Sequence, residues 1–113
     1  MSTFENSEEL SKMDRLLERS RALRKNHQNV EAEGLMKEAL AISNRMKTPE
    51  YGHLCHILDE LGTISFWNGK HPEAETFYKA ALETAELATY PGHSSVAPIL
   101  DHLAHLYIAM DQF

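Results

Sequence analysis

The sequence predicts an all-α fold made of antiparallel helix pairs, and three observations support this prediction. The chain has 113 residues, of which 42% are apolar, enough for one small domain with a packed core. It contains only five glycines and four prolines, which is too few for a loop-rich or all-β protein. Apolar residues recur at helical spacing, and the sequence repeats itself after 42 residues. Repeats of this length are typical of helical solenoids.

The internal repeat aligns the chain with itself without a gap. Leu16, Leu58 and Leu100 fall at equivalent positions, and the segments NHQNVEAEGLMKEAL (26–40) and NGKHPEAETFYKAAL (68–82) share seven identical residues. We therefore expect a single domain, 1–113, and divide it into repeats of about 12–53 and 54–95 and an incomplete third repeat, 96–113.

Each complete repeat is expected to contain two helices. The apolar periodicity places five helices at about 5–25, 30–46, 49–68, 72–89 and 95–110. Thr48-Pro49 and His71-Pro72 are typical of helix starts, since a proline in the first turn loses no hydrogen bond. Asn68-Gly69 suits a left-handed turn at the end of the third helix.

The second repeat contains a pattern of small and large residues at Leu58, Leu61-Gly62, Ala74, Tyr78 and Ala81. The small residues at three of these positions would let two antiparallel helices approach closely, while the larger ones fill the space beside them. This pattern resembles the tetratricopeptide repeat (TPR). The 42-residue period is similar to the variant found in kinesin light chains. This resemblance implies a right-handed superhelical solenoid of about two and a half TPR repeats.

The resemblance also implies a concave groove, lined by the first helix of each repeat, that receives an extended peptide or a helix. We expect its basic end at Arg21, Arg24 and Lys25, and an apolar anchor at Phe66 and Trp67. The alternative is a solvated face with Trp67 packed against the neighbouring helix. The remaining expected groove residues include an acidic pair, Asp59 and Asp101. The others are Leu17, His56, Thr63, His105 and Ile108.

The fifth helix is expected to present the residues that would hold a further helix. These are Leu100, Leu103, Ala104 and Tyr107. Two explanations are open: the chain is a piece of a longer protein, or a second copy covers this face and makes a homodimer.

Charge and motifs exclude several classes of function. The net charge of −6 argues against nucleic-acid binding, and no apolar run reaches the roughly 20 residues of a membrane span. The single cysteine, Cys55, indicates a reducing, cytoplasmic setting. His56 and Glu60 are one helical turn apart, as are Asp101 and His105, a spacing that puts possible metal ligands on one helix face. The sequence nevertheless contains no established metal-binding motif, no glycine-rich phosphate loop and no arrangement typical of a catalytic nucleophile. We therefore expect no cofactor, no metal and no enzyme activity.

The function that the sequence predicts is a non-catalytic module for protein–protein interaction. It would bind a peptide or protein segment in the groove and form the N-terminal part of a larger adaptor or regulatory protein. The alternative is a homo-oligomeric assembly module in which the last helix packs against a second copy.

Overall fold

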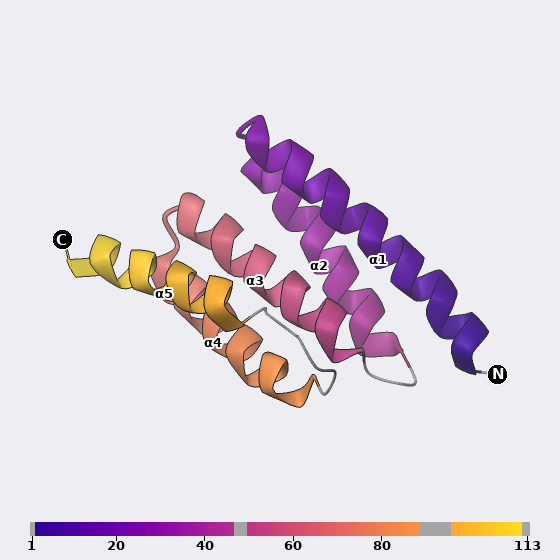
Figure 1. Cartoon of the computed structure of the whole chain (residues 1–113). Coiled ribbons are helices and arrows are strands. Elements are labelled where there is room, and N and C mark those ends of the chain that lie inside the picture. The colour runs from indigo at the N-terminus through magenta and orange to yellow at the C-terminus, as the bar shows by residue number, and fades with distance from the viewer. Residues whose placement is uncertain (1, 47–49, 89–95, 112–113) are drawn as a thin grey trace.

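The computed structural model describes residues 2–46, 50–88 and 96–111, with side chains described from Ser7 onwards, and this part of the chain is helical with no strand (Figure 1). Its helices are α1 (Ser2–Lys25), α2 (Asn29–Arg45), α3 (Tyr51–Trp67), α4 (His71–Leu87) and α5 (Val96–Asp111). The expected all-α fold and its five helices are confirmed, with boundaries that differ by up to three residues. The expected helix start at Thr48-Pro49 lies outside the described residues.

The helices form two hairpins and a fifth helix. α1 packs against α2 and α3 against α4, each pair joined by a short turn, and α5 lies against α4 (Figure 1). Gly69 in the α3–α4 turn has a φ of 78°, as expected for a left-handed turn, and nothing lies within 4 Å of where its Cβ would be. Pro72 is the second residue of α4. None of the described helices is long and apolar enough to span a bilayer.

The core consists of two clusters that meet in α3. The first joins α1 and α2 to one side of α3, where Ile57, Leu61 and Ile64 are fully buried. The second joins the other side of α3 to α4 and α5, through Cys55 and Leu58. Because α3 contributes to both clusters, it is the central helix of the stack.

The packing of the core follows the 42-residue repeat. It also shows that one expectation from the sequence was wrong. Ile57, Leu61 and Ile64 pack against the preceding hairpin, and the equivalent residues of α5 do the same against α3 and α4. Leu103 is the equivalent of Leu61 and is only 7% exposed. The placement of Leu103 on an open self-association face was therefore wrong.

The close approach of α3 and α4 depends on Gly62. Tyr78 is buried against it, and a Cβ added to Gly62 would lie 2.6 Å from two ring carbons of Tyr78. Ala74 and Ala81 are fully buried on the same side of α4. The predicted role of small residues in this helix pair is consistent with these contacts.

Candidate functional site

A hollow of about 510 Å³ opens between α3 and α5, with α4 beneath it and the end of α1 at one side. Six of the expected groove residues line it, and three further residues were not foreseen. The expected ones are Arg24, Thr63, Phe66, Trp67, His105 and Ile108; the others are Tyr78, His102 and Ala109.

The floor of the hollow is a hydrogen-bonded pair of side chains beneath an imidazole. Thr63 Oγ1 donates to the Asp59 carbonyl at 3.1 Å, so Tyr78 donates its hydroxyl proton to Thr63 Oγ1 at 3.0 Å. The rings of Tyr78 and His102 stack, with centroids 5.5 Å apart. Burial raises the pKa of Tyr78 to about 12, which keeps the phenol neutral and able to donate.

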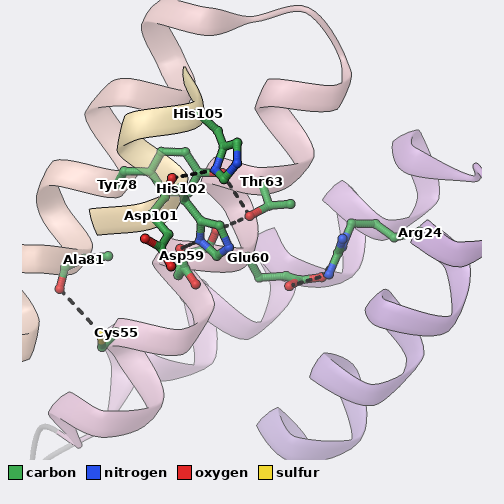
Figure 2. Close-up of polar contacts among 10 residues, drawn as sticks. All are labelled: Arg24, Cys55, Asp59, Glu60, Thr63, Tyr78, Ala81, Asp101, His102 and His105. Carbon is green, nitrogen blue, oxygen red and sulfur yellow. Dashed lines mark hydrogen bonds and ion pairs between the residues drawn. The ribbon is translucent and has the colours of Figure 1, made fainter. Parts of the chain in front are cut away.

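His102 connects α5 to α3 through Asp59. His102 Nδ1 lies 2.8 Å from Asp59 Oδ1, and a dashed line marks this contact in Figure 2. The hydrogen bond to this carboxylate raises the pKa of His102, and partial burial opposes the shift. His102 lines the hollow and Asp59 does not, and the Asp59 carboxylate is held by its hydrogen bond to His102.

Arg24 connects α1 to α3 through a buried carboxylate. Its Nε lies 2.7 Å from Glu60 Oε2 and its Nη2 lies 3.2 Å from Oε1, a two-pronged arrangement (Figure 2). Ser20 donates a further hydrogen bond to Oε2 at 3.3 Å. Glu60 is only 6% exposed, and one signal in the sequence could have found this pair: a carboxylate amid the apolar residues of a helix needs a partner.

Trp67 stands between two hollows. Its side chain is 65% exposed and meets the Phe66 ring edge to face, with centroids 5.4 Å apart. A second hollow of about 260 Å³ lies between Trp67 and the α1–α2 turn, where Arg24, Lys25 and His27 line it with Asn29. Trp67 therefore does not pack against a neighbouring helix, as the alternative had it, whereas the solvated face of that alternative stays a prediction.

The remaining expected groove residues lie elsewhere. Arg21, His56 and Asp101 are exposed and line neither hollow. The Asp101 carbonyl instead accepts a hydrogen bond from His105 Nδ1 at 2.8 Å (Figure 2). Leu17 is a core residue, buried in the cluster that α1, α2 and α3 form together.

The expected self-association residues other than Leu103 lie on the surface of α5. Leu100 and Tyr107 are 51% and 42% exposed, and Ala104 is also exposed. Tyr107 donates a hydrogen bond of 2.6 Å to Glu75 Oε2 of α4.

The described part of the chain contains no cluster of metal ligands, and its cysteine is buried. No group of three or more His, Cys, Asp or Glu there could hold a metal ion. Cys55 is fully buried between α3 and α4, and its Sγ lies 3.5 Å from the Ala81 carbonyl (Figure 2).

One comparison with known proteins identifies a family motif. Residues 54–89, which include most of α3 and all of α4, match the family model described as tetratricopeptide repeat. Neither a curated protein nor a solved structure matches the chain. Tetratricopeptide repeats generally mediate protein–protein interaction, and the family is generally non-catalytic. The match supports a tetratricopeptide repeat in the α3–α4 hairpin, where Gly62 and Tyr78 make the close helix contact.

Proposed function

We propose that this chain is a non-catalytic interaction module that binds a peptide or protein segment in the hollow between α3 and α5. One observation carries the proposal: Trp67 and Ile108, 65% and 59% exposed, flank this hollow above a polar floor. Large apolar side chains beside a concave site gain free energy when a ligand removes them from water. Tryptophan is also among the residues most enriched in binding hot spots.

The charges around the hollow favour a segment with an apolar residue next to an acidic one. Arg24 forms an ion pair with Glu60, and Asp59 is hydrogen-bonded to His102, so both side chains already have partners within the protein. Lys25 is exposed beside the second hollow, and no described carboxylate pairs with it. An apolar side chain would fill the larger hollow, and a carboxylate two to four residues away would reach Lys25 across Trp67.

The wider role rests on the same groove. We propose a single domain of the 42-residue, kinesin-light-chain-like kind, in the cytoplasm, within an adaptor or regulatory protein. The turns and the core both follow the 42-residue period, which supports this variant. The single cysteine, which is buried, suits a reducing compartment.

The emission of Trp67, the only tryptophan, tests the proposal directly. Peptides of about ten residues with one central leucine, flanked by aspartates, lysines or serines, would be titrated into the protein. We expect the aspartate series to shift the emission with affinities of about 1–100 μM, and the lysine series to bind at least tenfold more weakly.

Matched variants locate the binding site. Ile108→Ala should weaken binding of a labelled aspartate peptide, measured by anisotropy, about tenfold. Val30→Ala, which changes a residue 77% exposed on α2 that lines neither hollow, should leave it unchanged. No emission change with any peptide, or equal losses in the two variants, would rule out this groove as the site.

A further inference from the structure

The second hollow, beside Trp67, is lined by basic and amide side chains. Its volume is about 260 Å³, and its walls are Arg24, Lys25, His27, Asn29 and Trp67. Arg24 and Trp67 also line the larger hollow, so the two hollows are neighbours. Among the residues that the structure describes, no acidic side chain lines the second hollow, although the chain carries a net charge of −6. The positive charge is therefore local and favours a compact anion, because a long polyanion would meet repulsion from the rest of the protein.

One edge of the Arg24 guanidinium is held in place, and its other edge is open. A guanidinium has five N–H donors in a rigid plane. Nε and Nη2 contact the two carboxylate oxygens of Glu60 at 2.7 and 3.2 Å, a contact marked in Figure 2. Because Glu60 is buried, this contact fixes the plane of the guanidinium. The remaining N–H donors, two on Nη1 and one on Nη2, can bind a second anion in a two-pronged manner.

Lys25 and Asn29 add hydrogen-bond donors from other directions. Lys25 and His27 are exposed, and neither has a side-chain partner in the described part of the chain. The nearby carboxylate of Glu31 instead accepts a hydrogen bond from Gln28 at 3.2 Å and does not line the hollow. Donors from the end of α1 and the start of α2 therefore surround the hollow, and no carboxylate of the hollow competes for them.

A phosphate monoester matches this set of donors better than a carboxylate does. It carries a charge of about −1.5 to −2 at pH 7 and has three strong acceptor oxygens, whereas a carboxylate carries one charge on two oxygens. Arg24, Lys25 and Asn29 present three separate donor groups to the hollow. Arginine forms two-pronged contacts with phosphate, as the open edge of Arg24 allows. The exposed ring of Trp67 supplies an apolar wall for the carbon atoms that carry the phosphate.

We infer that the second hollow binds the phosphate group of a phosphorylated residue in the partner segment. This inference rests on the proposed function, because the same segment would place its apolar residue in the larger hollow. Trp67 lines both hollows, so one segment that crosses its ring can occupy the two together. Phosphorylation of the partner would then strengthen its binding to this chain.

Three labelled peptides that differ at one position test the inference. Each has a leucine followed three residues later by serine, aspartate or phosphoserine, and anisotropy gives its affinity for the full chain. We expect the phosphoserine peptide to bind at least tenfold more tightly than the aspartate peptide. Lys25→Ala should remove most of this advantage. Lys12→Ala, the same change at an exposed lysine of α1 that lines neither of these two hollows, should preserve it.

Phenyl phosphate provides a test that needs no peptide. Trp67 is the only tryptophan, so its indole N–H gives a single NMR signal. We expect phenyl phosphate to shift this signal saturably, with a Kd of roughly 1–10 mM, and benzoate to shift it much less.

The outcomes separate this inference from the proposed function. A phosphoserine peptide that binds no more tightly than the aspartate peptide would overturn the inference and leave the proposed function intact. If no peptide binds, the proposed function is wrong and phenyl phosphate decides on the site. A saturable shift that Lys25→Ala removes would support a phosphate site, whereas no saturable shift, or one that Lys25→Ala leaves unchanged, would overturn it.

Discussion

His27 and Gly69 lie 42 residues apart in equivalent turns, and both have a positive φ, 62° and 78°. Each turn is closed in the same way: Gln28 N–H donates to the Leu23 carbonyl at 2.9 Å, and Lys70 N–H to the Ser65 carbonyl at 2.8 Å. This is the six-to-one hydrogen bond that ends many helices. The repeat therefore extends to backbone conformation, including a position where the residue type differs.

Replacing His27 by glycine should stabilise the protein. A residue with a Cβ costs about 1–2 kcal/mol in the left-handed region, and glycine loses about 0.5–1 kcal/mol more backbone entropy on folding. We expect a net increase of about 0.5–1 kcal/mol in the free energy of unfolding, measured with urea. Gly69→Ala should have the opposite sign, and an unfolding free energy lower for His27→Gly than for wild type would contradict the assignment.

Two glycines within helices should respond in opposite directions to alanine. A Cβ added to Gly34 of α2 would have nothing within 4 Å, so Gly34→Ala should stabilise by up to about 1 kcal/mol through helix propensity. Gly62→Ala would force Tyr78 to move, because the new Cβ would lie 2.6 Å from its ring. Overpacking of this kind costs about 1–3 kcal/mol, which exceeds the gain in propensity. Thermal unfolding of the two variants checks the difference, and equal melting temperatures would show that α4 can shift freely.

The Arg24–Glu60 pair should matter more than an exposed ion pair. Arg24→Ala would leave a nearly buried carboxylate without its main partner, and we expect a loss of about 1–3 kcal/mol, discounted because Arg24 is partly exposed. Lys37→Ala removes an exposed lysine that pairs with Glu33 in α2 at 3.7 Å, and because Lys70 also lies 3.9 Å from Glu33, the change should cost no more than about 0.5 kcal/mol. Urea unfolding of both variants provides the comparison. Similar losses of unfolding free energy in the two variants would contradict the prediction, because they would mean that water solvates Glu60 as well as the Arg24 guanidinium does.

The His102–Asp59 contact should make the docking of α5 depend on pH. The folded pKa of His102 is raised above its usual value near 6.5, with Asp59 as the first cause; Arg24 opposes the shift and Asp101 assists it. The stabilisation is therefore complete below about pH 6.5 and is lost as the pH rises through the folded pKa. An NMR titration should show that Asp59→Asn lowers this pKa, and that Asp101→Asn lowers it less. An unchanged His102 titration in Asp59→Asn would contradict the contact.

Residues that pack between helices could be predicted from the sequence better than residues that form hydrogen bonds or ion pairs between helices. Gly62, Tyr78 and Ala81 were identified because helix spacing and side-chain size determine which residues fit between two helices. Leu103 was misplaced because periodicity shows that a residue is on an apolar stripe but does not divide the stripe between two neighbours. The equivalent residue Leu61 packs against the preceding hairpin, α1 and α2. By the 42-residue repeat, Leu103 is expected to pack against the hairpin that precedes α5.

The candidate site was predicted in part for a related reason. The resemblance to the tetratricopeptide repeat implied Arg24, Trp67 and Ile108, each from the face of a single helix. The pairs Arg24–Glu60 and Asp59–His102 join residues 36 and 43 positions apart, and they depend on the rotation of one helix relative to another. On α5, His102 rather than Asp101 faces the hollow, a difference of one position that spacing alone cannot resolve.

Because α3 contributes to both core clusters, its position determines which parts of the molecule unfold locally. Leu61 belongs to one core cluster and Leu58, three residues earlier, to the other. Loss of the α1–α2 hairpin would expose half of α3, and loss of α4 and α5 would expose the other half. Each half of the stack is therefore expected to be less stable without the other. Amide hydrogens should consequently exchange last in the middle of α3, at the free energy of global unfolding, and earliest towards the free side of α5.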